Sequence, residues 1–568
     1  MAGRPTAEPG RLPGSLPVGR KPVLLLALLG CALAVAMNPS LSANLDRLPA
    51  DSADRMFQAW QVAWNGHALL TQPLGLFDSN IYWPFENTVA FSDALLGFTP
   101  AGFIGRGSEA ALVRYNLLFL FSYASAFVAA ALLARELGAG WPAAVVAGTA
   151  FAFAPWRLAH HNHLHVLASA PLPLCLFLLL RGYRMRRPGL VFAGFLAATW
   201  QVSLGFTLGL QMAYLLGLLA VLWGIHWWRS RPAVPRRVAA ATIAGAAVLV
   251  VWSGLPALPY LRVVEEHPEA RRTVETVKFY SPPIDSFLIA PPESLVWGGV
   301  TSDRRQTVAW APEMALFPGV TVMVLALTGL AASGLPRRWR LGLLAAAAGS
   351  GILALGYSFL GGSLTYGLLY KLPGWASVRT PGRLFTLTSL ALALLAGAGA
   401  HRLAALAATR RSTGSSGRVL VLAVPAVLTV ALLAEGFGRP AGELVRSQVR
   451  SLPASEPQMH LPSDDFDDVQ YLFWSIDGFP EIVNGYSGFT PKLQLSLRRE
   501  LAGFPDSASV QRLRELGVAT VVLHTDRTGG TPWAGADHRP VDGLGLRRSD
   551  EGPVVVFDLE PANRQGGG

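Results

Sequence analysis

The sequence predicts an all-α polytopic membrane protein of about eleven transmembrane helices, followed by a small carboxyl-terminal α/β domain. Of its 568 residues, 51% are hydrophobic and only 15% are charged. The apolar residues gather in runs long enough to cross a bilayer. The formal charge of +11 comes from short basic groups between these runs. This spacing argues against a nucleic-acid-binding protein, because no single basic surface results.

The apolar runs define the expected topology. We expect spans at 21–38, 112–134, 142–156, 164–181, 189–205, 206–227, 238–258, 314–334, 341–357, 384–406 and 419–436. Arginine clusters follow alternate spans, and nearly all acidic residues lie in the other loops, so the positive-inside rule places the amino terminus inside and the carboxyl terminus outside the cytoplasmic membrane. A cleaved signal peptide is the alternative for the first run, but apolar sequence continues past Cys31 without a close cleavage site.

Three domains follow from this topology. Residues 1–19, rich in Pro, Gly and Arg, are expected to form a disordered cytoplasmic tail. Residues 20–436 form the transmembrane domain with a first outer loop at 39–111, and residues 437–568 form an extracytoplasmic α/β domain. In the last of these, "SVQRLRELG" is typical of a helix that ends at Gly517, while "VATVVLH" and "PVVVFDL" are typical of buried strands. The acidic run "DDFDD" at 464–468 is expected to be a solvated loop.

The first outer loop contains a strongly amphipathic helix, "DSADRMFQAWQVAWNGHALL". At 100° per residue, Asp54, Gln58, Gln61 and Asn65 form one stripe and the aromatic residues lie opposite. We expect the aromatic face to lie on the outer leaflet and the polar stripe to line a pocket. Asp51 fits the helix N-cap, and Asp54 fits either the acid-favouring first turn or a catalytic role.

Six stretches carry a family resemblance: "DRMFQAWQVAWNGHAL" (54–69), "NIYWPFENTVAFSD" (80–93), "FAPWRLAHHNHLHVL" (153–167), "EMALFPG" (313–319), "LYKLPGWASVRTPGR" (369–383) and "NGYSGFTP" (484–491). Their layout resembles the GT-C superfamily of integral-membrane glycosyltransferases. The resemblance implies inverting transfer of a sugar from a polyprenyl-phosphate donor to a lipid or cell-envelope glycan acceptor, on the outer face of the membrane. It implies Asp54 as the general base, because an attacking hydroxyl must lose its proton. Asp93 is the second acid, with capping of a re-entrant helix as its alternative.

A phosphate leaving group needs positive charge on the same side. Arg157, Arg379 and Arg383 lie at or near the outer ends of expected spans, where a guanidinium can bind phosphate with two hydrogen bonds. Their alternative is snorkelling to the interface. Arg271, Arg272 and Lys278 belong to one basic outer loop and are interpreted as solvated charge. Gln58 and Gln61 complete the expected substrate-binding set.

The run "HHNHLH" at 160–165 raises the question of a metal. His161 and His165 have the i, i+4 spacing that can chelate a divalent ion on a helix. Some GT-C enzymes have an Asp-x-Asp motif in this loop, whereas this loop has histidines and no Asp-x-Asp. We therefore favour hydrogen-bonding histidines, with His161 in the substrate site, and assign no metal.

Two other functions stay open. A transporter or flippase of lipid-linked sugars would need ionisable residues in mid-span and helices broken in matched halves, and few such features occur. A catalytically inactive GT-C-like scaffold is compatible with the sequence, because each proposed site residue has a structural alternative. The sequence contains no Walker A loop, nucleotide-binding glycine fingerprint or serine nucleophile elbow.

Overall fold

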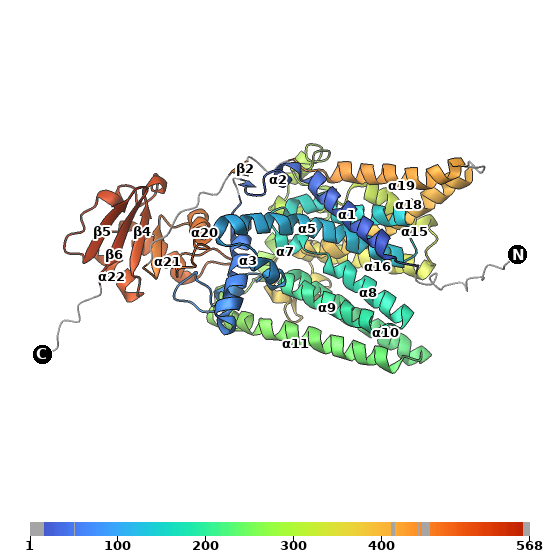
Figure 1. Cartoon of the computed structure of the whole chain (residues 1–568), viewed down its shortest axis with the longest axis horizontal. Helices are drawn as coiled ribbons and strands as arrows, with labels where there is room; N and C mark the ends of the chain where they lie inside the picture. The colour runs from blue at the N-terminus through green and yellow to red at the C-terminus, as the bar shows by residue number, and fades with distance from the viewer. Residues whose placement is uncertain (1–15, 50–51, 411–414, 440–443, 446–454, 561–568) are drawn as a thin grey trace. The chain divides into compact units, whose positions relative to one another are not determined.

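The computed structural model describes residues 16–49, 52–410, 415–439, 444–445 and 455–560. The described chain divides into two compact units. The helical unit comprises Met1–Ala43, Asn116–Leu255 and Arg272–Glu443, and the α/β unit comprises Asn44–Tyr115, Pro256–Arg271 and Leu444–Gly568. Each unit therefore joins segments that lie far apart in the sequence (Figure 1).

The chain is a mostly helical, multi-pass membrane protein. Seven stretches of the described chain are helical, long and apolar enough to cross a membrane, and they belong to α1 (Arg20–Met37), α5 (Gly107–Glu136), α7 and α8 (Leu164–Leu167, Pro171–Met185), α10 (Phe206–Ser230), α11 (Arg236–Glu266), α18 (Phe385–Arg410) and α19 (Ser415–Gly436). Three shorter apolar helices are α6 (Trp141–Ala152), α9 (Pro188–Leu204) and α15 (Val320–Ala332). The polytopic prediction is confirmed. Each expected span overlaps a helix, counting α16 (Arg337–Ala354), while the number of eleven spans stays a prediction.

The expected span at 314–334 is shorter than its apolar run. α15 begins only at Val320, after Gly319 with φ +98°. Before it, the short α14 (Ala311–Met314) ends, and the backbone N–H groups of Leu316 and Phe317 bond to the carbonyls of Ser286 and Ile289. The "EMALFPG" stretch is therefore a loop outside the span, and it contributes a side chain to the candidate site.

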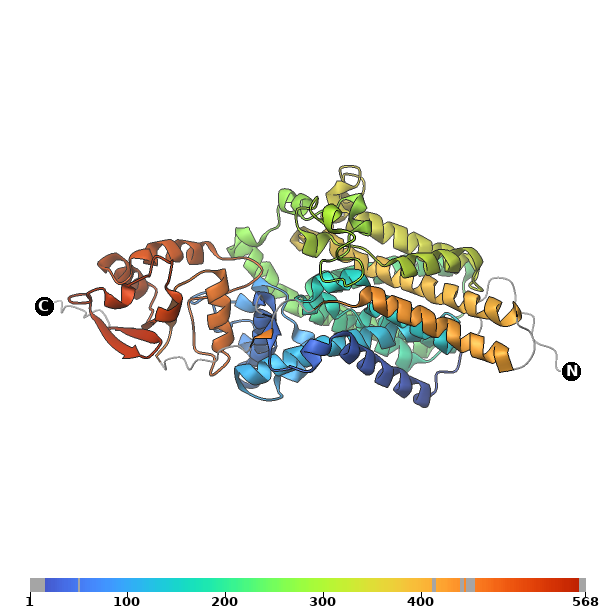
Figure 2. The ribbon, with the colours of Figure 1, turned by 90° about the horizontal axis from the view of Figure 1, so that it is seen from above.

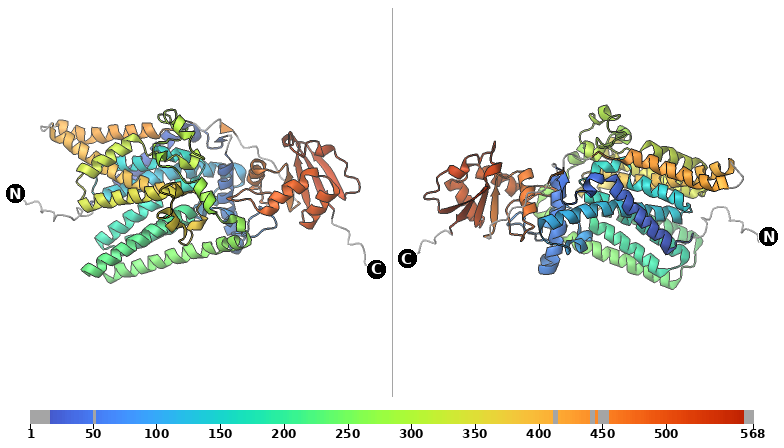
Figure 3. Two further views of the ribbon diagram at one scale, coloured as in Figure 1. Left: turned by 180° about the vertical axis from the view of Figure 1, so that it is seen from behind. Right: turned by 45° about the horizontal axis from the view of Figure 1, so that its top comes forward.

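Small residues bring the helices of the helical unit together. α15 packs against α18 where Gly329 faces the backbone of Leu395 and Gly399, with no room for a side chain. α8 packs against α9, and α9 packs against α10 (Figure 1 and Figure 3). Close backbone approach at glycine is a usual way for helices to associate in lipid. Several short helices connect the long ones: α2 (Pro39–Ser42), α12 (Val274–Phe279), α13 (Ser302–Arg305) and α17 (Tyr366–Tyr370).

The carboxyl-terminal region of the α/β unit is built on a four-stranded mixed sheet, seen from a second direction in Figure 2. Its order is β3-β4-β6-β5, from Gln458–Leu461, Thr520–His524, Val554–Leu559 and Leu546–Glu551, with only β3 and β4 parallel. α20 (Asp465–Trp474), α21 (Lys492–Glu500) and α22 (Ser507–Glu515) accompany the sheet. The predicted helix and both predicted strands are confirmed, and Gly517 follows α22 with φ +74°, as an αL helix stop requires.

The prediction for the acidic run "DDFDD" at 464–468 is wrong. The run is not a solvated loop, because Asp464 caps α20 through the N–H groups of Phe466 and Asp467, and Asp468 is fully buried. Asp468 accepts hydrogen bonds from Ser463, Asn484, Gln494 and Arg498. An acidic run before apolar residues also fits a helix start, and that interpretation holds.

The aromatic face of α3 (Ala53–Thr71) is covered by protein rather than by lipid. Trp60 and Trp64 are 1% and 3% exposed. The Trp60 indole donates to Asn80 Oδ1 at 3.1 Å, and the Trp64 ring packs edge-on against Phe479 at 5.4 Å. The expected position of this face on the outer leaflet is therefore wrong, because residues near the carboxyl terminus of the chain bury it. β1 (Leu48–Pro49) pairs with β2 (Leu444–Val445), and α4 (Thr99–Gly102) packs on α3 in the same unit.

Candidate functional site

In the α/β unit, the candidate base lies in the first turn of α3. Asp54 follows the N-cap residue Ser52, and it is half-buried. The hydroxyl of Tyr486 donates to Asp54 Oδ1 at 2.9 Å, and the Tyr486 ring packs edge-on against Phe57. Asp51, expected as the N-cap, lies outside the described residues. The Asp54 carboxylate is thus oriented by a residue that follows it by 432 positions.

The polar stripe of α3 fixes the backbone around Asp93. Gln61 Nε2 donates to the carbonyl of Asp93 at 2.7 Å, and Asn65 Nδ2 donates to the carbonyl of Ala94 at 2.7 Å. Tyr260 bridges the same turn, with its hydroxyl donating to Ser92 and accepting from the N–H of Ala94. Asp93 is not the N-cap of a re-entrant helix, since Leu95 occupies the N-cap position of the next helical turn and this described segment continues only with the short helices Leu96–Phe98 and Thr99–Gly102. Gln58, a member of the same polar stripe, is also buried.

Three of the six stretches that carry the family resemblance meet in this unit. The N–H of Tyr82 bonds to the carbonyl of Asn484, and the Tyr82 ring lies against Gly485, where a Cβ would come within 2.6 Å of it. Phe91 contacts Phe489 with a centroid distance of 4.7 Å. Residues 54–69, 80–93 and 484–491 are therefore one structural cluster around Asp54 and Asp93.

The other three stretches meet in the helical unit, around a buried ion pair. Arg383 Nε lies 3.2 Å from both carboxylate oxygens of Glu313, and Arg383 Nη2 lies 2.5 Å from Oε1. Glu313 is 3% exposed and Arg383 is 7% exposed. The remaining donor, Arg383 Nη1, lies 2.9 Å from His165 Nε2. Arg383, expected to bind phosphate, is thus held by protein groups in this structure.

Two further histidines extend this cluster. His160 Nδ1 and His163 Nδ1 are 3.2 Å apart, and His163 Nδ1 lies 3.9 Å from Glu313 Oε1. Burial lowers the pKa of His160 to about 3, so this ring is neutral. Burial would raise the pKa of Glu313, but the nearby Arg383 guanidinium outweighs burial and holds that pKa below its usual range.

The helical chelating pair that the spacing of His161 and His165 would allow does not form. Residues 155–160 form a 3-10 helix and α7 begins only at Leu164, so the i, i+4 geometry does not arise. His161 Nδ1 instead lies 2.9 Å from the carbonyl of Leu158, while His165 contacts Arg383. His160, His163 and Glu313 lie close together, and one potential metal-ligand atom of each lies within 4.8 Å of those of the other two.

The two other candidate phosphate ligands have different surroundings. Arg157 is 1% exposed, donates to Ser169 and to the carbonyl of Leu167, and lies 5.2 Å from the Tyr123 ring centroid. Burial lowers the pKa of Arg157 to about 10. Arg379 lies 5.3 Å from the Tyr280 ring centroid. The two arginines therefore differ in exposure. Arg157 is enclosed by aromatic rings, whereas Arg379 is only partly buried.

Arg272 is not simply solvated charge, contrary to expectation. Burial, together with the smaller effect of the positive charge of the nearby Arg379, lowers the pKa of Arg272 to about 10. Arg271 and Lys278 are exposed, as predicted. The loop therefore holds two neighbouring guanidinium groups, from Arg272 and Arg379, beside the Tyr280 ring.

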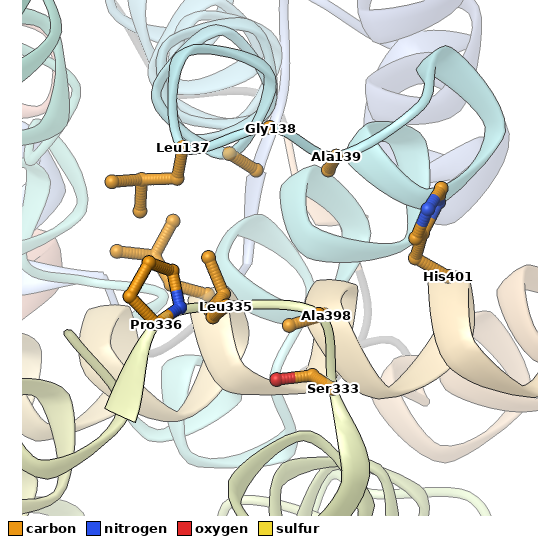
Figure 4. Close-up of a pocket in the computed structure, with 11 residues that line it drawn as sticks. Leu137, Gly138, Ala139, Ser333, Leu335, Pro336, Ala398 and His401 are labelled. Atoms are coloured by element: carbon orange, nitrogen blue, oxygen red, sulfur yellow. The ribbon is translucent and has the colours of Figure 1, made fainter. Parts of the chain in front are cut away.

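Sequence reasoning missed Glu313, His160, His163 and Tyr486 as site residues. The available signal was that all four lie inside the resembling stretches, and that Glu313 is an acid in an otherwise apolar one. A separate cavity of about 230 Å³ in the helical unit is lined mainly by apolar residues, with Ser333 and His401 at its edge (Figure 4). It includes none of the candidate site residues named above.

Comparisons with known proteins support the fold. No protein-family model matches the chain, and no curated protein matches it. Among solved structures, the mycobacterial arabinofuranosyltransferase AftD matches over 97% of this chain with 16% sequence identity and a TM-score of 0.58. The match spans 40% of the AftD chain. ArnT from Cupriavidus metallidurans, solved with undecaprenyl phosphate, matches over 95% of this chain and 98% of its own, with 18% identity and a TM-score of 0.48. The chain therefore shares the fold of the matched part of AftD, and this likeness agrees with the architecture that the sequence resemblance implies.

Proposed function

We propose that the chain is a membrane glycosyltransferase that moves a sugar from a polyprenyl-phosphate-linked donor to a hydroxyl of a lipid or cell-envelope glycan acceptor. The observation that carries this proposal is the match of nearly the whole chain to the fold of an arabinofuranosyltransferase. The reaction is proposed to occur on the outer face of the cytoplasmic membrane, with the amino terminus inside.

Asp54 is the proposed general base. In an inverting transfer, the acceptor oxygen bonds to the anomeric carbon, the bond from that carbon to the phosphate oxygen breaks, and the acceptor proton passes to the carboxylate. The hydrogen bond from Tyr486 supports this role, because it fixes the orientation of the carboxylate in a half-buried position. Asp93 is the proposed second acid, and Gln61 positions it through its backbone carbonyl. Gln58 is proposed to support the same polar face.

Arg379 is the proposed phosphate ligand, together with Arg272. A guanidinium can form two parallel hydrogen bonds to phosphate, and two neighbouring cations attract a phosphate dianion. Arg157 and Arg383 are weaker candidates, because Ser169 and Glu313 respectively already accept hydrogen bonds from them. His161, in the histidine-rich stretch at 160–165, is retained as a proposed substrate contact.

A complementation experiment tests the base. A strain that lacks this protein is supplied with the wild-type chain, with Asp54→Asn, or with Asp303→Asn, an exposed acid outside the proposed site. Mass spectrometry of envelope glycans and lipid-linked sugars is expected to show the missing sugar restored by wild type and Asp303→Asn, but not by Asp54→Asn. The melting temperature of each purified variant checks folding.

The outcomes separate the competing functions. Full restoration by Asp54→Asn would remove Asp54 as the base. Loss of folding in Asp54→Asn would favour a structural role in the first turn of α3. Accumulation of a lipid-linked precursor that stays on the inner face would favour a flippase over a transferase.

A further inference from the structure

The histidine cluster of the helical unit has the geometry of a metal-binding site. The two ring nitrogens His160 Nδ1 and His163 Nδ1 are 3.2 Å apart. Two nitrogens bound to one tetrahedral Zn²⁺ at about 2.0–2.1 Å each are separated by roughly 3.3 Å. The observed spacing therefore allows both nitrogens to bind one ion without movement of the rings away from each other.

The third ligand comes from a distant part of the chain. Glu313 Oε1 lies 3.9 Å from His163 Nδ1, and all three ligand atoms lie within 4.8 Å of one another. Arg383 holds the Glu313 carboxylate from the other side through its Nε and Nη2 groups. Hydrogen bonds of this kind orient a metal-ligating carboxylate, and such outer partners commonly affect metal affinity.

We propose that His160, His163 and Glu313 bind one divalent transition-metal ion of the zinc class. Two imidazoles and one carboxylate are a ligand set that suits Zn²⁺, while Mg²⁺ prefers a set made of oxygens. Three protein ligands leave a fourth tetrahedral position for another group, as in zinc sites that bind substrate or water. His163 is the most exposed of the three ligands, with 16% of its side chain accessible, so the ion can enter from this side.

The charges of the cluster predict the fourth ligand. Glu313 and Arg383 cancel each other, so a bound divalent ion brings an uncompensated charge into a largely buried place. An anionic oxygen at the open position would offset this charge, because an unpaired charge is costly when it is removed from water. The site is thus expected to combine a metal with an oxyanion rather than with a further neutral side chain.

Metal binding is measured with the full-length protein in detergent, after treatment with a chelator and dialysis. ZnCl₂ alone is titrated by calorimetry, and the metal content after dialysis is measured by mass spectrometry. The wild-type chain is expected to retain one Zn²⁺ per chain, and MgCl₂ is expected not to compete. His163→Gln is expected to weaken Zn²⁺ binding by at least tenfold.

His161→Gln is the matched control, because His161 lies in the same loop but faces the carbonyl of Leu158. It is expected to keep the wild-type affinity for Zn²⁺. Glu313→Gln provides a second test that leaves both histidines in place. Lack of stoichiometric Zn²⁺ binding by the folded wild-type chain would overturn the proposal, and so would equal affinities of wild type and His163→Gln. Neither readout depends on glycosyl transfer, so failure here and failure of the proposed function are distinguishable.

Discussion

The ion pair between Arg383 and Glu313 gives a sharp stability prediction. Arg383→Met removes the guanidinium, so the Glu313 carboxylate loses three hydrogen bonds of 2.5–3.2 Å. This carboxylate is only 3% exposed, so water does not replace them. A surface pair would contribute roughly 0–1 kcal/mol. Removing one partner of a buried pair instead costs roughly 3–5 kcal/mol, since the remaining charge is stranded away from water. Burial decides between these cases, so we expect the larger destabilisation.

A double-mutant cycle separates the attraction between the two charges from the cost of burying a single unpaired charge. Glu313→Gln combined with Arg383→Met removes both charges, so the double variant is expected to be more stable than Arg383→Met alone. Unfolding is followed by tryptophan fluorescence in detergent, using the 16 tryptophans of the chain. A chelator is present throughout, so that bound metal does not contribute.

Arg338→Met is the matched control, because Arg338 is exposed. Its change in the free energy of unfolding is expected to stay within about 0.5 kcal/mol. The reasoning is refuted if Arg383→Met unfolds as late as Arg338→Met, or if the effects of the two single substitutions simply add in the double variant.

Two further predictions concern the α/β unit. Gly66→Ala is expected to destabilise it by about 1–3 kcal/mol, since the new Cβ would lie 2.5 Å from the Gly102 carbonyl, and this overpacking exceeds the gain in helix propensity; a higher melting temperature would contradict it. Burial raises the pKa of Asp468 from 3.8 to about 6, although Arg498 opposes the shift. The folded chain therefore binds more protons between these values, and stability is expected to fall by about 2 kcal/mol as pH rises from about 4 to about 6. Melting curves across this range test the trend, and an equally steep trend in Asp468→Asn would rule out Asp468 as its source.

Local patterns predicted much of the fold. The helix around Asp54 and the strands at 520–524 and 554–559 follow from side-chain periodicity, because that periodicity is fixed by the backbone. The same patterns did not show whether lipid or protein covers each apolar face of a helix. The aromatic stripe with Trp60 and Trp64 has the spacing suited to a lipid surface, yet protein covers it. An apolar face can be buried by lipid or by protein, and periodicity is the same in both cases.

Pairing across long sequence separations could not be predicted. Glu313 and Arg383 are 70 residues apart, and Asp54 and Tyr486 are 432 residues apart. The histidines were judged by helical spacing, although the chain there is a 3-10 helix followed by a turn, so His160 and His163 meet instead of His161 and His165. Gly319 marks the corresponding break before α15, and Glu313 lies before this break, in the short helix α14.

Burial and charge partners indicate which of the candidate arginines have a structural role and which can bind a ligand. Arg383 is neutralised by Glu313, and Arg157 is enclosed by hydrogen-bond acceptors and aromatic rings, so both charges already have protein partners that offset desolvation. Arg272 and Arg379 differ, because each lies near another cation, and the charge of Arg379 lowers the pKa of Arg272. Like charges that are held together raise the energy of a folded chain, and an anionic ligand relieves that cost. Arg272 and Arg379 are therefore better suited than the two buried arginines to bind the phosphate as a pair, although the sequence named only Arg379 as a phosphate ligand.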